Sequence, residues 1–599
     1  MELTKRQDVP AEQTWNLADL FSSKEAWEQE LKELEEDADK LSIYTGKLGE
    51  RASNLLLCLQ AREALLERGV RVMTYATLTL SGDGSDSDAQ ASASLAQQVY
   101  ASVQAKLSNV EAEILALPKS LIEQFEKEES ELATYRVYLH KVMSDKPYAL
   151  TPETEETLAA LGPVMNAPYA IYSTSKSADM TFPSFSGKNG EEQPLSFARF
   201  EDQYELSPNT EERRRAYEAF DGTLQQYEHT FAKTYATEVT KQVTLSRIRG
   251  HHSVTDMLLH SQDVTQTMYE NQLDIIYKEL APHMQRYAKL KKRVLELDEM
   301  RFCDLKAPLD PDFEPETSYE KASEMIKAAL EPLGEEYRSM LDQAFAERWV
   351  DRADNIGKAT GAFCSSPYGV HPYILLTWKD TMRGAFMLAH ELGHAGHFYL
   401  ANAHQPLNAT RPSTYCIEAP STMNELFLGN HLLTATEDPR MKRWVLMQFI
   451  GTYYHNFVTH LLEGEFQRHV YRFAEDGQPL TATLLRKTKL EVLQGFWGDA
   501  VVLDEGAGRT WMRQPHYYMG LYPYTYSAGL TAATKAYSLY QNEGQPVIDA
   551  WLEMLKAGGT KQPLDLLRMA GVDMEDPETI RDAVAYVGTL ISELEESFA

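Results

Sequence analysis

The chain has 599 residues with a formal net charge of −31, and 43% of the residues are hydrophobic. A charge of this sign argues against partners such as nucleic acid or anionic membrane surfaces, while the apolar fraction is ample for a folded core. The four cysteines form no Cys-x-x-Cys pair, no apolar run approaches a membrane span, and the N-terminus lacks the apolar stretch of a signal peptide, so we expect a cytoplasmic protein without a disulfide framework.

The first 200 residues are expected to form an N-terminal helical domain. Residues 1 to 13 are polar, and we expect them to be loose. Helical patterns follow at about 24 to 41, 51 to 78, 86 to 116 and 119 to 143. Gly187-Lys188-Asn189-Gly190 is typical of a hairpin turn, and we place a domain boundary soon after it. The boundary separates residues 1–200 from residues 201–599.

Helical patterns also dominate the second domain. They run at about 222 to 249, 265 to 298, 318 to 348, 438 to 475 and 479 to 495. Two short strand signals, at 361–364 and 371–378, precede the next helix. We expect the second strand to leave an open edge, where the backbone of Tyr373, Ile374 and Leu375 can pair with an extended peptide. The alternative is a strand that only packs under that helix.

The segment His390-Glu391-Leu392-Gly393-His394 lies in a helical pattern that Asp380 or Thr381 can cap. His390 and His394 are four residues apart on one helical face, so their imidazoles can aim at one metal ion. Glu391 is offset by one position and can hold a water molecule without binding the metal. The pattern predicts a zinc site with a general base. The alternative is a helix that carries two unrelated histidines.

A catalytic zinc site needs a third protein ligand. The extended metzincin pattern fails, because this chain has His397 and Leu400 where Gly and His are required. Glu418 and Glu425 lie seven residues apart on one helical face, and Pro420 places Glu418 at the helix entrance. We predict that Glu418 is the third ligand and that Glu425 orients a ligand histidine. We expect His397 to be a packing residue, because a fourth protein ligand would close the site to water.

A cluster of aromatic residues lies near the C-terminus. His516 and five tyrosines occur within the eleven residues 516–526. Phenols and a neutral imidazole are suitable hydrogen-bond donors for a developing oxyanion. For any single tyrosine, the alternative is a packed aromatic cluster.

Several motifs together carry a family resemblance. They are Gly361-Ala362-Phe363-Cys364, the helix of His390, Ile417-Glu418-Ala419-Pro420-Ser421 and the segment that begins at His516. The chain resembles the oligoendopeptidase F branch of the thimet oligopeptidase family of zinc metallopeptidases. The resemblance implies a mainly α fold, with two helical lobes around a deep substrate channel and a small β-sheet beside the zinc helix.

The same resemblance assigns roles to site residues. One Zn²⁺ per chain would be held by three ligands, His390, His394 and Glu418. Glu391 would be the general base, and His516 with a neighbouring tyrosine would contact the tetrahedral intermediate. The local spacing differs from that of thimet oligopeptidase itself, and we choose Tyr522 and Tyr526 for this contact.

The sequence therefore predicts a zinc-dependent endopeptidase that hydrolyses internal bonds of short, unstructured oligopeptides. A helical zinc carboxypeptidase would use the same core motif and is one alternative. A peptide-binding protein with a structural zinc is another, but Glu391 argues against it because a structural site needs no general base. Cys416 lies two residues from Glu418, and we expect it to be a buried, inert thiol.

Overall fold

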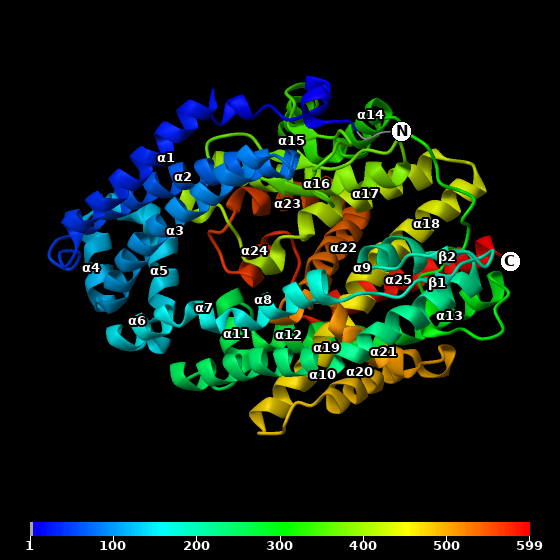
Figure 1. Ribbon diagram of the computed structural model, residues 1–599. Coiled ribbons are helices and arrows are strands. Elements are labelled where there is room, and N and C mark those ends of the chain that lie inside the picture. The colour runs from blue at the N-terminus through cyan, green and yellow to red at the C-terminus, as the bar shows by residue number, and fades with distance from the viewer. Residues whose placement is uncertain (1–3) are drawn as a thin grey trace.

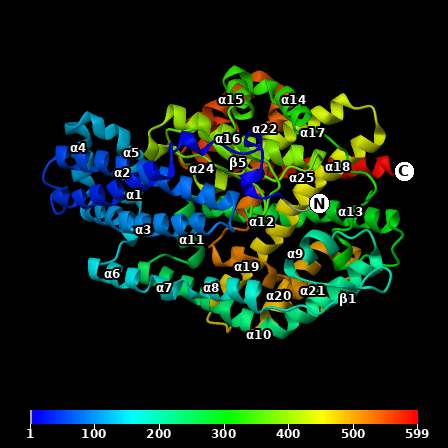
Figure 2. The same cartoon turned by 45° about the horizontal axis from the view of Figure 1, so that its top comes forward.

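The computed structural model describes residues 4–599, and most of them lie in helices (Figure 1). The N-terminal helices are α1 (Lys24–Asp39), α2 (Ala52–Gly82), α3 (Ser87–Ala116), α4 (Lys119–Glu128) and α5 (Arg136–Ser144). They project at the left of the molecule in both views (Figures 1 and 2). None of the helices in residues 4–599 combines the length and the apolar character that a membrane span requires.

Many of the remaining helices form an upper and a lower group in these views (Figures 1 and 2). The upper group contains α14 (Tyr319–Ala329), α15 (Gly334–Ala346), α16 (Met382–His404) and α17 (Ala419–Ala435). The lower group contains α10 (Thr210–Arg249), α19 (His460–Glu475), α20 (Ala482–Trp497) and α21 (Glu505–Arg509). Further helices are α12 (Gln266–Ile275), α13 (Ala281–Val294), α18 (Pro439–Tyr453), α22 (Thr525–Glu543), α23 (Gln545–Ala557) and α25 (Pro577–Ser597). The predicted helical fold is confirmed, while the deep channel stays a prediction.

Buried apolar residues form two large clusters. One contains residues between Trp27 and Met143, and the other contains residues between Tyr172 and Leu594. The hairpin is present, with β1 (Phe185–Ser186) antiparallel to β2 (Glu192–Gln193), and Phe185 belongs to the second cluster. The chain therefore passes from the first cluster to the second between Met143 and Tyr172, before residue 200. The domain boundary that we placed there stays a prediction.

A sheet of short strands lies beside α16, as predicted. Its strands are β3 (Val350–Asp351), β4 (Phe363–Ser365) and β5 (Tyr373–Leu375), in the order β3-β5-β4. The central strand β5 is parallel to β3 and antiparallel to β4, and each of its residues is 0% exposed. The prediction that Tyr373, Ile374 and Leu375 offer an open edge is therefore wrong. Its second partner, β3, is only two residues long and carries no periodic signal.

The N-terminal segment lies beside β3, at the edge of the sheet opposite β4. Our expectation of a loose segment is therefore wrong for residues 4–13. Arg6 forms an ion pair with the buried carboxylate of Asp351 in β3. The backbone N–H of Arg352 donates to the carbonyl of Gln13 at 2.9 Å. Trp15 and Leu20 are buried against Tyr373 and Leu375. With the β3 side occupied, β4 is the strand whose outer edge has no backbone partner among residues 4–599.

Candidate active site

Helix α16 carries the His-Glu-x-x-His motif and begins at the predicted cap. Thr381 accepts a hydrogen bond from the backbone N–H of Gly384 at 3.2 Å, which satisfies one free donor of the first turn. One helical turn separates His390 from His394, so both imidazoles leave the same face. Their side chains are 28% and 15% exposed, so water can reach them although most of α16 is buried.

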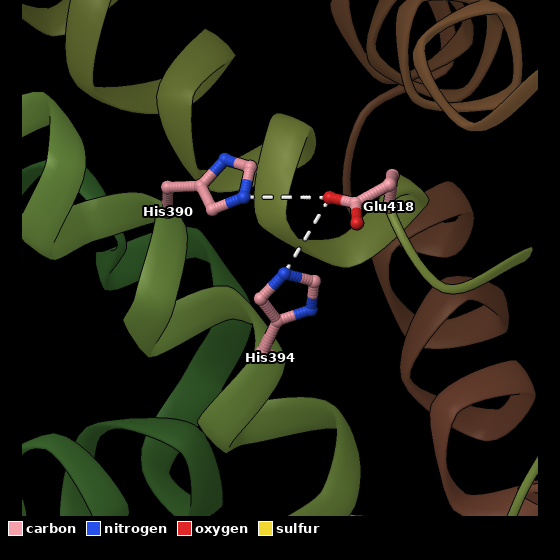
Figure 3. Close-up of side chains that lie close together, drawn as sticks. All are labelled: His390, His394 and Glu418. Carbon is pink, nitrogen blue, oxygen red and sulfur yellow. Dashed lines mark ion pairs between the residues drawn. The ribbon is translucent and has the colours of Figure 1, made fainter. Parts of the chain in front are cut away.

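Glu418 is the residue just before α17, and Pro420 lies in the first turn of that helix, as predicted. Its Oε2 atom lies 3.3 Å from Nε2 of His390 and 3.4 Å from Nε2 of His394 (Figure 3). Two ligand atoms bound tetrahedrally at about 2.05 Å from one zinc ion are about 3.3 Å apart. The three side chains therefore have the chemistry and the spacing that a zinc ion requires.

Close packing of α16 on α17 produces this spacing. A Cβ atom on Gly393 would lie 2.5 Å from the carbonyl oxygen of Pro420 and 2.5 Å from Cα of Ser421, so only glycine fits between the two histidines. One turn further along α17, the Asn424 amide donates to the carbonyl of Ala389 at 3.1 Å. The two helices are thus held together just before the motif, at Ala389, and within it, at Gly393.

Glu425 lies behind His390. Its Oε1 atom accepts from Nδ1 of His390 at 2.7 Å, and its Oε2 atom accepts from the Thr452 hydroxyl at 3.2 Å. A proton held on Nδ1 leaves the lone pair of Nε2 free, and Nε2 faces Glu418. The predicted contact between Glu425 and His390 is therefore present, while its role in orienting a zinc ligand stays a prediction. Thr452, which fixes the carboxylate, belongs to α18 and was not found from the sequence.

Glu391 is almost completely buried, and its Oε2 atom has no hydrogen-bond partner among the described residues. Burial raises the pKa of this carboxyl group above its usual value, although the neighbouring His390 and His394 partly oppose the shift. A carboxylate with an unpaired oxygen and an elevated pKa is suited to accept a proton from water and to release it again.

His516 lies with the two tyrosines that we chose. Its ring centroid is 5.5 Å from Tyr522 and 5.5 Å from Tyr526, and the two tyrosine rings are 5.3 Å apart. Tyr526 is in the first turn of α22, which passes Glu418 so closely that a Cβ atom on Gly529 would lie 2.8 Å from its Cβ. The cluster therefore lies beside the candidate metal ligands. By contrast, Tyr517 and Tyr524 are each 1% exposed and belong to the core.

Two other residues of this region, His397 and Cys416, do not belong to the group of three candidate ligands. His397 is buried, both its ring nitrogens lack partners among the described residues, and burial lowers its pKa to about 3. The imidazole is therefore neutral. Burial raises the pKa of the Cys416 thiol to about 12, so it stays protonated and unreactive.

A second group of possible metal ligands was not found from the sequence. His460, Glu463 and His516 each offer one atom, and these atoms lie within 4.8 Å of one another. Glu463 and His516 are 53 residues apart and share no motif. Only the packing of α19 against the segment of His516 brings them together.

Comparison with known proteins agrees with the peptidase chemistry that the candidate site suggests. Residues 203–586 match a family model described as peptidase family M3. The chain belongs to peptidase family M3. A second model, described as oligopeptidase F, matches residues 113–182. The family resemblance seen in the sequence is confirmed, and this M3 protein is a metallopeptidase.

Relatives of this M3 peptidase match it over nearly their full length. It is 34% identical to oligopeptidase PepF of Bacillus subtilis. The match extends over 595 residues and covers 99% of this chain and 88% of the relative. It is 28% identical to group B oligopeptidase PepB of Streptococcus agalactiae, over 99% and 98% of the two chains. The crystal structure of oligoendopeptidase-F from Enterococcus faecium matches with a TM-score of 0.75 and 26% identity, over 95% of this chain and 98% of that chain. These matches favour neither the carboxypeptidase nor the structural-zinc alternative.

Proposed function

We propose that this M3 peptidase is a zinc-dependent oligoendopeptidase, which hydrolyses internal bonds of short, unstructured peptides. The arrangement of His390, His394 and Glu418 around one metal-sized space beside Glu391 carries the proposal. Two imidazoles and one carboxylate are a common ligand set of catalytic zinc. When bound there, zinc polarises the scissile carbonyl and lowers the pKa of the attacking water.

The proton transfers belong to Glu391. Its unpaired Oε2 atom takes the proton of the attacking water, and the same carboxyl group then delivers it to the nitrogen of the leaving amine. His516, with Tyr522 or Tyr526, donates hydrogen bonds to the oxygen that becomes negatively charged. Glu425 keeps the ring of His390 oriented through its bond to Nδ1.

The substrate backbone would pair with the outer edge of β4 and not with β5. The strand β4 packs beside α16, and its outer edge has no backbone partner in the part of the chain that the structure describes, whereas β5 is paired on both sides. Backbone pairing binds many sequences, because it uses groups that every peptide possesses. A site between two helical lobes would admit an extended peptide of about 5 to 20 residues, at about 3.3 Å per residue, and would exclude a folded domain.

One experiment tests both the bond position and the substrate class. A peptide blocked at both ends would be incubated with the zinc-loaded enzyme, and the same sequence would be offered in an exposed loop of a stable domain. We expect internal cleavage of the free peptide and none in the loop, both read by mass spectrometry. No cleavage of the blocked peptide, with release of a C-terminal residue from an unblocked one, would contradict the endopeptidase assignment. The cytoplasmic location stays a prediction.

A further inference from the structure

A buried carboxylate, Glu463 of α19, lies behind His516. Its Oε2 atom is 3.9 Å from Nδ1 of His516 and accepts a hydrogen bond from Nδ1 of His460 at 2.8 Å. The side chain of Glu463 is only 5% exposed and is not one of the three candidate zinc ligands. It therefore needs another explanation than metal binding at the active site.

The ring of His516 has a closed side and an open side. Nδ1 is fully enclosed and has no hydrogen-bond partner within 3.5 Å among the described residues. The side chain as a whole is 17% exposed, so its accessible part lies on the opposite side of the ring, where Nε2 is. Glu463 thus contacts the back of the ring. Tyr522 and Tyr526 lie beside it, with ring centroids at 5.5 Å.

The charges around Glu463 determine where the protons are. Burial alone would raise the pKa of this carboxyl group, but His460, His516 and Lys489 outweigh burial and hold the pKa below its usual value. The group is therefore a carboxylate, which can only accept hydrogen bonds. The ring of His460 donates to it through Nδ1, and Nε2 of His460 is then free to accept from Nε2–H of His455 at 3.1 Å.

The protonation of His516 follows from the same rule. Its Nδ1 lies within ion-pair distance of the Glu463 carboxylate, at 3.9 Å, and has no other partner among the described residues, so the carboxylate favours a hydrogen on this nitrogen. A neutral imidazole with a hydrogen on Nδ1 has a lone pair on Nε2 and cannot donate to an oxyanion. Only the imidazolium ion presents N–H groups on both sides of the ring, and a buried anion beside it is the group that stabilises this ion.

We propose that Glu463 is a positioning residue, which keeps a proton on Nδ1 of His516 and stabilises the imidazolium ion whose Nε2–H donates to the oxyanion. The role rests on the proposed function, in which His516 contacts the tetrahedral intermediate. A charge-assisted donor is roughly twice as strong as a neutral one, so the carboxylate gives the oxyanion a stronger partner than a tyrosine hydroxyl.

The same residues do not form a second metal site. Both ring nitrogens of His460 already have partners, Glu463 at 2.8 Å and His455 at 3.1 Å. A metal ion would have to displace the hydrogen that joins His460 to Glu463. A hydrogen-bond network accounts for the group without that loss. Metal analysis separates the two interpretations, because a second site would bind a second equivalent of zinc.

The titratable groups around this network limit how a pH profile is interpreted. Glu463 and His460 of α19 face His516 directly, and His455 lies on the far side of His460. Tyr522 and Tyr526 flank the ring, and Lys489 of α20 adds a positive charge near Glu463. Of these groups, Glu463 is the only carboxylate, so its removal takes away the counter-charge of the imidazolium ion.

The test is the variant Glu463→Gln, which keeps the size of the side chain and removes its charge. We expect kcat to fall about 10- to 100-fold, by analogy with the losses found when the hydrogen-bond partner of a metal-binding histidine is removed. KM should change little, because the contact to the oxyanion forms in the transition state. The alkaline limb of the kcat profile should move to lower pH, because the imidazolium ion loses its proton more easily without the carboxylate.

Three further measurements make the result decisive. Glu465→Gln is the matched control, since Glu465 is equally buried on α19 but pairs with Arg468 and His469, and it should leave kcat and the pH profile unchanged. Adding Glu463→Gln to His516→Ala should cost no more than about twofold, because a positioning residue acts through its partner. NMR titration of ¹³C-labelled histidine should show His516 losing its proton at a lower pH in Glu463→Gln than in the wild type.

Several outcomes would overturn the proposal. They are independent losses in the double variant, an unchanged His516 titration in Glu463→Gln, or two zinc equivalents in the wild type and one in Glu463→Gln. The NMR titration does not depend on activity, so it tests the contact even if the zinc-loaded wild type cleaves no peptide. That last result would refute the proposed function instead.

Discussion

The glycine of the motif offers a demanding test of how the site is built. In Gly393→Ala, the new Cβ atom would lie 2.5 Å from the Pro420 carbonyl oxygen, whereas ordinary contacts lie at 3.4–4 Å. Relieving the clash requires α16 and the start of α17 to move apart by about 0.9 Å, because both contacting atoms belong to backbones that cannot rotate away. Zinc–ligand distances tolerate changes of only about 0.2 Å, so Glu418 would be displaced from the metal.

The expected losses follow from this displacement. Overpacking of a tight contact costs about 1–3 kcal/mol of stability, and a misplacement of about 1 Å in an active site costs about 10²-fold in rate. Gly393→Ala should therefore bind zinc more weakly and lose about 10²-fold in kcat/KM. Gly451→Ala is the matched control, because it lies in helix α18 and its Cβ atom would meet nothing within 4 Å. It should retain activity.

The assay combines zinc content after dialysis, kcat/KM on a fluorogenic peptide and thermal unfolding. Zinc content, rate and stability should all fall in Gly393→Ala and remain near wild type in Gly451→Ala. If Gly393→Ala keeps one zinc and a rate within about twofold of the control, the close packing of α16 on α17 does not position Glu418, and our account of the site geometry is refuted.

Three other substitutions test single roles. His394→Ala should lose the metal, and a variant that keeps stoichiometric zinc would remove His394 from the ligand set. Glu391→Gln should keep its zinc and lose about 10²–10⁴-fold in kcat, because one residue serves both proton transfers; activity within about tenfold of wild type would exclude it as the base. Glu425→Gln should weaken zinc binding about 10- to 100-fold, as measured by competition with a chelator, and an unchanged Kd would show that its bond to His390 is unimportant.

Local signals account for the parts of the site that sequence alone could predict. The spacing of His390 and His394 and the position of Pro420 relative to Glu418 are each properties of one helix, so a single sequence contains them. The structure brings these residues to one point, with Glu425 behind His390. The start of α16 at Thr381 followed from ordinary capping chemistry in the same way.

The errors concern contacts between distant segments. The position of β5 at the centre of its sheet depends on β3, whose two residues show no alternation. The unbroken apolar run from Tyr373 to Leu376 is typical of a strand that is covered on both faces, and this signal could have indicated burial. Glu463 gave no signal, because a glutamate in an amphipathic helix is usually solvated and its partner His516 lies in another segment.

The N-terminal segment shows the same limit. Residues 4–13 are polar and look unstructured, yet Arg6 pairs with Asp351, which is 0% exposed. The partners of this polar segment, such as Asp351 and the backbone of Arg352, lie far along the chain, and nothing within the segment reveals where they are. Tertiary partners of this kind require the structure.

The most direct test of the central claim is a zinc titration of the metal-free enzyme, with peptide cleavage as the readout. The account predicts that activity is absent without metal, rises linearly with added zinc and reaches a plateau at one equivalent per chain. Glu391→Gln should bind the same single equivalent and stay inactive, since it lacks the base but keeps His390, His394 and Glu418. Cleavage by the metal-free enzyme, or a plateau that is reached only at two equivalents, would contradict the single catalytic zinc site.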